Sequence, residues 1–219
     1  MGVLFDGDNH IEVAGYSVPS AATGIVSFSF WMRADVISNN NSMFGSATNM
    51  EMNMNGGGNL RVNIFGGGAA STFALTAGVW VHIVADGNAN TDISRLWVNG
   101  VLETTNGGQT SATVGTNLYI GWSNGQPDNR HFVGAIDDFR KYNRLLSLNE
   151  IQTIFNTRGK DGITFGLQHR YLFSENAPGT TVGVGGAVDF GSSRNNGNGL
   201  DAPLPERIES ILSFRKPYL

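Results

Sequence analysis

The sequence contains no cysteine, and this absence excludes several kinds of site. A disulfide framework, a zinc site built on thiolates and a cysteine nucleophile all require that residue. Charged residues are also scarce, at 15% of the 219 residues, where about a quarter is usual. The formal net charge is −4 and no run of Lys and Arg occurs. We therefore expect no binding to the phosphates of nucleic acid.

Long apolar runs are absent as well. No stretch reaches the roughly 18 apolar residues that a membrane-spanning helix needs, so we expect no membrane partner. The chain opens with the letters MGVLFDG, which show no basic segment followed by an apolar one, so no secretory signal is visible. If the protein acts outside a cell, we expect it to leave by a route other than a cleaved N-terminal signal or to travel as part of a particle.

The residues that are abundant indicate a β-protein. Hydrophobic residues make up 40% of the chain and include 13 Phe and 4 Trp, which is enough for a packed core. The 30 Gly, the many Asn and the scattered β-branched and aromatic residues are typical of short strands joined by turns. Helical bundles need a different composition and a helical spacing of apolar residues.

Alternation of apolar and polar residues predicts where the strands lie. Residues 26–33 place Val and two Phe on one face. Residues 50–54 alternate Met with Glu and Asn, and residues 60–64 alternate again after three glycines, which predicts a hairpin. Further strands are expected at residues 79–84, 95–98, 101–103, 117–120, 132–136, 167–173 and 187–190.

One short helix is predicted directly after residue 147. Ser147 and Glu150 have the spacing of a capping box, in which each side chain bonds the other residue's backbone N–H. Gly159 is a suitable terminator. The apolar residues expected on its buried face are Leu148, Ile151, Ile154 and Phe155.

Six segments carry motifs in a set order. They are residues 3–13 (VLFDGDNHIEV), 26–33 (VSFSFWMR), 78–84 (GVWVHIV), 96–101 (LWVNGV), 118–121 (LYIG) and 132–147 (FVGAIDDFRKYNRLLS). Together they resemble the laminin G-like, concanavalin A-like lectin and glucanase family over about residues 1–157. The resemblance implies an all-β, two-sheet antiparallel jelly-roll sandwich, here with one short helix and an extended C-terminal tail.

The C-terminal part of the chain differs from the family order. Residues 169–181 and 188–199 resemble a segment that precedes the first strand in relatives. We predict a jelly roll over residues 1–200, with residues 157–200 supplying a permuted strand and loop; pairing with another subunit is the alternative. Residues 201–219 are expected to form the extended tail, since four of the six Pro lie between positions 178 and 217.

Catalytic patterns are missing. Related glucanases carry paired carboxylates two or three residues apart on a strand, and Glu51 has no acidic partner at that spacing. Asp137 and Asp138 lie in an Ile-Asp-Asp motif, where a structural role is more common. No nucleophile elbow or phosphate loop occurs, and the four His are widely scattered. We predict that the protein is not an enzyme, and rank a glycan hydrolase last.

A structural Ca²⁺ site follows from the resemblance. Sandwiches of this family often hold Ca²⁺ through Asp, Asn and backbone oxygens, the hard ligands that calcium prefers. The candidate ligands are Asp189, Asn195 and Asn196, with Asp137 or Asp138 completing the set. The alternative is a Gly- and Asn-rich loop stabilised by its own hydrogen bonds.

A sugar site is predicted on the loop before the Ile-Asp-Asp motif. Sugar recognition typically uses an exposed aromatic ring with Asn, Asp and Arg on loops. The candidate residues are Trp122, Asn124, Asp128, Asn129 and Arg130. The alternative is an ordinary polar loop with the Trp packed inward. The Asn-rich face of residues 49–55 is either a partner surface or simply solvated.

Two non-enzymatic functions remain. Stand-alone jelly rolls with such a tail resemble bacteriophage particle proteins, which implies a capsid decoration (cement) or fibre protein on the virion. The tail would then anchor to a capsid or other virion protein, or to a sister copy in a homo-oligomer. The anchoring residues would be Ile208, Ile211, Leu212, Phe214 and Arg215. The alternative is an extracellular, lectin-like module that binds cell-surface glycans.

Overall fold

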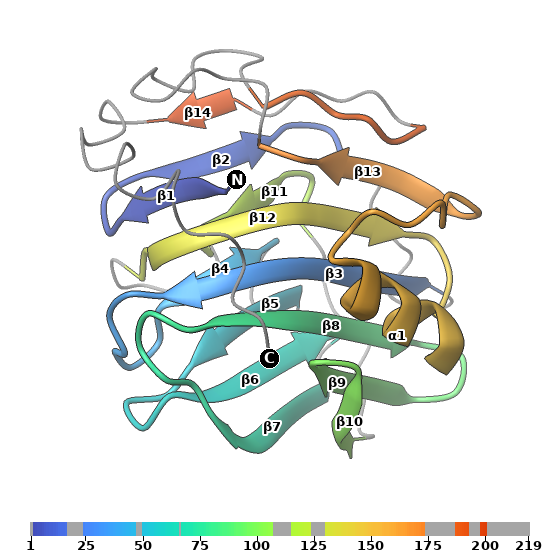
Figure 1. Cartoon of the computed structure of the whole chain (residues 1–219), viewed down its shortest axis with the longest axis horizontal. Helices are drawn as coiled ribbons and strands as arrows, with labels where there is room; N and C mark the ends of the chain where they lie inside the picture. Colours follow the sequence, from blue (N-terminus) through green and yellow to red (C-terminus); the bar gives the residue numbers. More distant parts are fainter. Residues whose placement is uncertain are drawn as a thin grey trace.

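The computed structural model describes residues 2–16, 24–46, 50–65, 67–106, 115–123, 130–173, 187–192 and 198–200. These residues form two antiparallel sheets packed face to face, with one short helix on the outside of the first sheet (Figure 1). The predicted all-β, two-sheet sandwich is therefore confirmed. The loop residues Asn124, Asp128, Asn129, Asn195 and Asn196, and the whole predicted tail over residues 201–219, lie outside the described residues.

The first sheet has the order β1-β12-β3-β8-β9-β10, and β13 also pairs with β12. Its strands are β1 (Val3–Asp6), β3 (Ile25–Ala34), β8 (Trp80–Asn88), β9 (Ile93–Val98), β10 (Val101–Asn106), β12 (Val133–Tyr142) and β13 (Leu167–Tyr171). The second sheet has the order β14-β2-β11-β4-β5-β6-β7. Its strands are β2 (His10–Val13), β4 (Ser42–Gly45), β5 (Met50–Met54), β6 (Asn59–Ile64), β7 (Gly67–Ala74), β11 (Leu118–Ile120) and β14 (Asn198–Leu200).

The core fills the space between the two sheets. The alternating apolar residues predicted in β3, β5 and β6 all point into it, and the predicted hairpin of β5 and β6 is present. Phe28, Phe30, Phe44 and Phe139 contact one another at ring-centroid distances between 4.5 and 6.0 Å. Because side chains alternate along a strand, the polar residues of β5 and β6 lie on the outer face of the second sheet.

Helix α1 (Leu148–Thr157) covers part of the outer face of the first sheet. The predicted capping box of Ser147 and Glu150 is present, and Ile151 and Ile154 are buried. Leu148 was expected on the buried face, and this was wrong: its side chain is 49% exposed. It occupies the first helical position, one turn before the residues that reach the sheet.

Residues 167–200 pair within their own chain where the structure describes them. β1 pairs with residues 133–136 of β12, and β13 pairs with residues 139–142, so β13 continues the same edge. β14 pairs with β2 at the edge of the second sheet. Both sheets are thus extended by the segment that the sequence places after the helix.

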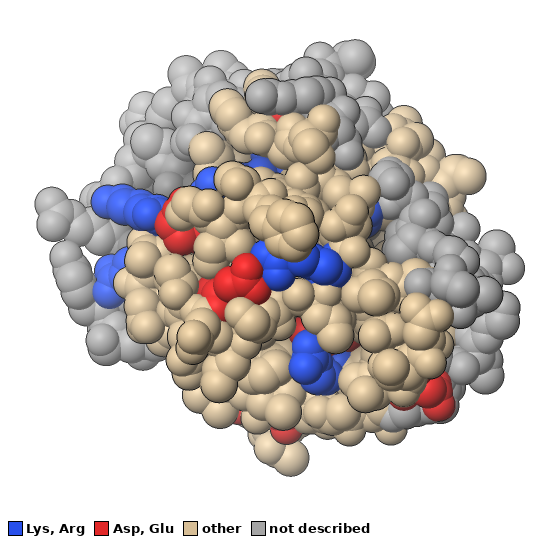
Figure 2. Space-filling model, turned by 90° about the vertical axis from the view of Figure 1, so that its right-hand side faces the viewer, with Lys and Arg blue, Asp and Glu red and all other residues tan. Residues whose placement is uncertain are grey.

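The surface shows no dominant charge on the side that Figure 2 presents. Lys and Arg side chains lie beside Asp and Glu there, and uncharged residues cover most of the area. Within the described residues, no helix has the length and apolar character to cross a membrane.

Candidate functional site

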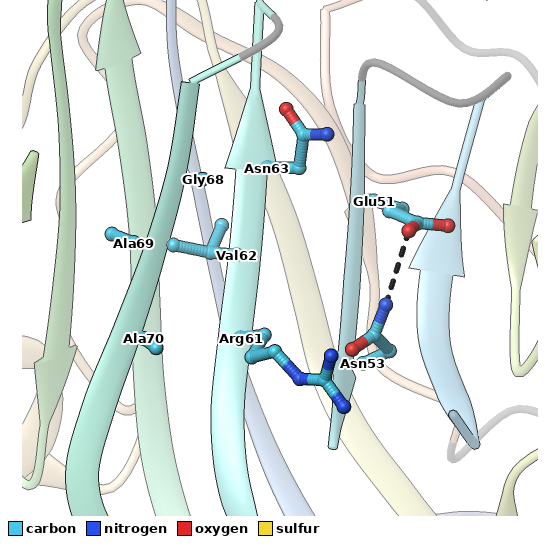
Figure 3. A pocket seen from close by; sticks show the side chains of 8 residues that line it. All are labelled: Glu51, Asn53, Arg61, Val62, Asn63, Gly68, Ala69 and Ala70. Carbon is cyan, nitrogen blue, oxygen red and sulfur yellow. Dashed lines mark hydrogen bonds between the residues drawn. The ribbon is translucent and has the colours of Figure 1, made fainter. Parts of the chain in front are cut away.

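A square of four polar residues occupies the outer face of the second sheet. Glu51 on β5 lies opposite Asn63 on β6, and Asn53 lies opposite Arg61. Their strand neighbours on the other face are core residues, so the period of two alone brings these four side chains to one surface. Figure 3 shows them on the same side of the two strands.

A hollow of about 260 Å³ lies over this square. β7 borders it with two small residues, Gly68 opposite Asn63 and Ala70 opposite Arg61. A Cβ atom added at Gly68 would meet no atom within 4 Å, so this side of the hollow is open because of the small residues. The lining residues are Glu51, Asn53, Arg61, Val62, Asn63, Gly68, Ala69 and Ala70 (Figure 3).

The carboxylate of Glu51 fixes the orientation of its neighbours. The Asn53 Nδ2 group donates to Glu51 Oε1 at 3.0 Å, and the Ser123 hydroxyl donates to Oε2 at 2.9 Å. A carboxylate only accepts hydrogen bonds when ionised, so the amide of Asn53 must present its NH₂ to Glu51 and turn its oxygen away. Glu51 and Asn53 are 5% and 7% exposed.

Arg61 and Asn53 each bring to the hollow a buried polar atom that has no hydrogen-bond partner among the described residues. Arg61 Nη2 donates to Asn39 Oδ1 at 3.1 Å. Arg61 Nε and Asn53 Oδ1 are both buried, and within the described residues neither has a hydrogen-bond partner. Buried polar atoms are nearly always satisfied in folded proteins, by the protein itself, by water or by a ligand. Arg61 Nε can therefore donate to a ligand in the hollow, and Asn53 Oδ1 can accept from it.

An aromatic group lies beside the hollow and consists of His10, Tyr119, Trp122 and His131. The Trp122 ring stacks on His131 at a centroid distance of 5.4 Å and an angle of 9°, and it lies 4.8 Å from His10. Tyr119 meets Trp122 edge-on at 5.0 Å. All four rings are half-buried, so the group forms a partly exposed aromatic surface.

The loop after β11 joins the aromatic group to the hollow. Its two ends are tied to β4, by bonds from Gly121 N to Met43 O (2.7 Å) and from Ser42 N to Arg130 O (2.9 Å). Ser123 lies on the sheet directly over Gly45, where a Cβ atom would come within 2.3 Å of the Ser123 hydroxyl. The glycine therefore lets Ser123 lie close against the sheet and reach the Glu51 carboxylate.

The structure places only part of the predicted sugar site. Trp122 is half-buried within the aromatic group, and Arg130 is half-buried where the loop returns to β4. The other three candidates lie outside the described residues. Arg61 and Asn63 were not predicted as site residues from the sequence. The alternation of polar and core residues along β6 could have indicated them, because Glu51 and Asn53 alternate with core residues on β5 in the same way.

The predicted metal ligand Asp138 is held by arginines. Its Oδ1 accepts from Arg140 Nε at 3.0 Å and from Arg170 Nε at 2.9 Å, and its Oδ2 accepts from Arg140 Nη2 at 2.7 Å. Burial by itself lowers the pKa of Arg140, but hydrogen bonds to Asp161 and Asp138 outweigh it and raise this pKa above its usual range. Asp138 therefore supports a buried ion-pair network.

The predicted ligand Asp189 is also engaged. Its Oδ2 lies 2.8 Å from His169 Nδ1, and its Oδ1 accepts from the backbone N–H groups of Arg170 and Gly191 at 2.8 and 2.7 Å. Asp137 is 5% exposed. Among the described residues, no group of three or more His, Asp or Glu side chains could hold a metal ion. The carboxylates of Asp138 and Asp189 thus do not fit the expected donor set, and calcium binding stays a prediction.

Comparison with known proteins agrees with this architecture. A family model described as the concanavalin A-like lectin/glucanases superfamily matches residues 5–152, and the chain belongs to that superfamily. No curated protein matches the chain.

Two solved structures share the fold at low sequence identity. One is a protein of Bacteroides ovatus ATCC 8483 named a "putative carbohydrate binding protein", with a TM-score of 0.71 and 20% identity. The alignment covers 94% of this chain and 61% of that one, so our chain spans only part of that protein's length. The other is domain 4 of AbnA, an extracellular arabinanase of Geobacillus stearothermophilus, in complex with arabinotriose. It has a TM-score of 0.53 and 16% identity over 70% of this chain and 75% of that one.

Proposed function

We propose that this protein is a non-enzymatic carbohydrate-binding module whose ligand lies on the outer face of the second sheet. The observation that carries the proposal is the junction of the aromatic group and the polar hollow, made by the hydrogen bond from Ser123 to Glu51. Sugar rings present apolar C–H faces together with hydroxyl groups. Half-exposed aromatic rings can pack against the apolar C–H faces, and fixed amides and a guanidinium can bond the hydroxyl groups.

The comparisons support the proposal without deciding it. The Bacteroides protein is named for carbohydrate binding, and the AbnA domain was solved with arabinotriose. Both share the fold of this chain at a TM-score above 0.5. A fold hosts many functions, so the argument depends on the residues of the outer face rather than on these names.

The same face argues against glycoside hydrolysis. That reaction typically needs two carboxyl groups about 5 to 9.5 Å apart. In the row of paired residues that contains Glu51, the next carboxylate among the described residues is Glu12, reached through Tyr119 and Gly45. Three strand spacings of about 4.8 Å put them roughly 14 Å apart. Glu51 is therefore assigned to positioning Asn53 and Ser123.

The virion role remains a separate prediction. It depends on the tail residues Ile208–Leu219, which lie outside the described residues. A phage particle protein that binds host glycans would satisfy both. Two locations are expected, the virion and the outside of the cell. A module that recognises cell-surface glycans fits the extracellular location better.

A glycan array with the purified full chain tests the proposal. We expect wild-type protein to bind at least one glycan class, and Trp122→Ala to weaken that binding about ten-fold or more through loss of the aromatic surface. Phe165→Ala is the matched control. It removes an aromatic ring that is 80% exposed and lies over Arg144, between α1 and β13.

The outcomes are distinct. Absence of binding to every glycan would refute the proposal. Equal losses in both variants would point to a general effect of removing an aromatic ring, and would refute the assigned face. Release of free sugar from a bound polysaccharide would refute the non-enzymatic assignment.

A further inference from the structure

We infer that the hollow between β5, β6 and β7 is a subsite for one neutral sugar residue, which binds through a hydroxyl group between Arg61 and Asn53. This inference rests on the proposed function and deepens it, because it names the chemistry of the ligand at one place on the face. It uses residues separate from the aromatic group, so the two can fail separately.

Arg61 Nε and Asn53 Oδ1 are complementary to a hydroxyl group. Arg61 Nε can only donate a hydrogen bond, and Asn53 Oδ1 can only accept one. The two residues lie directly opposite each other on β5 and β6, and Asn53 is 7% exposed. Neither atom has a partner within the described residues. A hydroxyl group satisfies both at once, since it accepts through oxygen and donates its proton.

The orientation of the Asn53 side-chain amide is fixed by its neighbours. The oxygen and nitrogen of an amide are easily confused by shape, but here the carboxylate of Glu51 decides between them. Its Oε1 accepts from Asn53 Nδ2 at 3.0 Å, which leaves Oδ1 on the side of Arg61 (Figure 3). Ser123 holds the other carboxylate oxygen at 2.9 Å. The acceptor in the hollow is therefore built into the fold.

The charges around the hollow favour a neutral group on the ligand. A carboxylate on the ligand would be attracted by Arg61 but would face Asn53 Oδ1 and, behind it, the Glu51 carboxylate. An ammonium group could donate to Asn53 Oδ1 but would lie against the Arg61 guanidinium. A neutral hydroxyl avoids both conflicts, and mismatched polar contacts in a buried place cost more than matched ones gain. The hollow thus favours neutral sugars over uronic acids and over amino sugars with a free ammonium group.

The volume of the hollow limits the size of the ligand group that it can hold. The hollow measures about 260 Å³, slightly below the roughly 300 to 1,000 Å³ of pockets that hold drug-sized ligands. One sugar residue is therefore the fitting occupant. A sugar hydroxyl can replace a water molecule at such a pair of atoms with the same hydrogen bonds.

The distance between the hollow and the aromatic group sets the length of the ligand. β6 and β11 are three strand spacings apart in the sheet order, or roughly 14 Å. Ser123 and Glu51 lie between them. A ligand that fills the hollow and also contacts the aromatic group must therefore be an oligosaccharide that runs across the strands. Trp122 and Arg61 would contact different sugar residues of the same chain.

A pair of glycine variants tests the subsite with the full chain. Gly68→Val places a side chain in the open space of the hollow, and valine suits a strand such as β7. Gly162→Val is the matched control, because its Cβ also meets nothing within 4 Å and it lies between α1 and β13. Arg61→Lys is the second variant, since it keeps the charge and removes the Nε donor.

Binding is measured on an array that carries neutral oligosaccharides beside oligosaccharides with uronic acids or amino sugars. We expect wild-type protein and Gly162→Val to bind neutral oligosaccharides equally. Gly68→Val and Arg61→Lys should bind the same ligands about ten-fold more weakly or worse, because a hydrogen bond to a charged group and the space for one sugar are lost. Circular dichroism confirms that each variant is folded.

The results separate the two proposals. If wild-type protein binds glycans, Trp122→Ala loses that binding and Gly68→Val keeps it in full, the subsite is overturned and the proposed function stands. Stronger binding of uronic acids, or of amino sugars with a free ammonium group, than of neutral sugars would overturn the charge argument. If wild-type protein binds no glycan at all, both proposals are refuted.

Discussion

A chain that ends after Gly159 should fail to fold stably, because the segment that follows completes both sheets. The truncation removes β13, the bridge between Tyr171 and Asp189, and β14. It also removes three large buried apolar side chains: Tyr171 at 0% and Phe173 at 8% exposure from the core between the sheets, and Leu167 at 7% from the cluster beneath helix α1. The structure therefore predicts a fragment that lacks part of its own core.

The magnitude follows from these side chains. Burying one large apolar side chain stabilises a fold by roughly 1.5 to 3 kcal/mol, so three contribute about 5 to 9 kcal/mol as an upper range. Loss of Asp161 and Arg170 also breaks the buried network around Arg140 and Asp138. Whole domains are stable by only about 5 to 15 kcal/mol. We expect the fragment to be largely unfolded at room temperature.

Urea denaturation followed by tryptophan fluorescence and circular dichroism measures this. The full chain should unfold cooperatively, and so should a control chain that ends at residue 200 and lacks only the predicted tail. A 1–159 fragment that unfolds cooperatively at the same urea concentration as the full chain would show that residues 167–200 do not complete the sandwich.

Three further predictions concern buried charges. Arg140→Leu should cost about 3 to 5 kcal/mol of unfolding free energy in urea, because it leaves Asp138 and Asp161 buried without their guanidinium; a loss under about 1 kcal/mol, as expected for the half-exposed Arg144→Leu, would contradict this. Asp138→Asn should lower the melting temperature equally in Ca²⁺ and in EDTA, and a loss seen only with Ca²⁺ would make it a metal ligand. Burial lowers the pKa of Lys141 from 10.5 to about 7, so the folded chain binds one proton fewer than the unfolded chain between these values. Its contribution to stability should therefore rise by about 1.4 kcal/mol per pH unit above pH 7, and a Lys141→Met variant measured from pH 7 to 9 that keeps the same rise would refute this origin.

Most of the strands that the sequence predicted have one face in the core; β10, predicted at residues 101–103, is an exception because it is largely exposed. Residues 50–54 and 60–64 alternate because Met, Leu, Val and Ile face inward and polar residues face outward, so they could be recognised without a structure. β4 and β7 were missed. β4 has only four residues, and β7 begins Gly-Gly-Ala-Ala-Ser, so neither shows a strong alternation. Their pairing with longer neighbours places them in the sheet.

The candidate site could be predicted only in part for a related reason. Trp122 stands out in any reading of the sequence as an aromatic residue in a polar loop. The hollow does not, because it depends on Gly68 lying across β6 from Asn63, and the register of three strands decides that. The ion pairs of Asp138 could not be predicted from the sequence either, and its role as a calcium ligand stays a prediction. Its partner Arg170 is 32 residues away and reaches it only through the pairing of β12 and β13.

The location of the tryptophans decides which face is open to a ligand. Three of the four are buried on the outer side of the first sheet, with Trp31 at 4%, Trp80 at 5% and Trp97 at 7% exposure. Helix α1 contributes to this burial, since Phe155 stacks on Trp31 at 5.8 Å. These rings are used for packing and cannot also contact a sugar. Trp122 is the remaining one, and it is half-buried beside the polar hollow of the second sheet. Of the four tryptophans, Trp122 is therefore the one that can contact a ligand, and it lies on the second sheet.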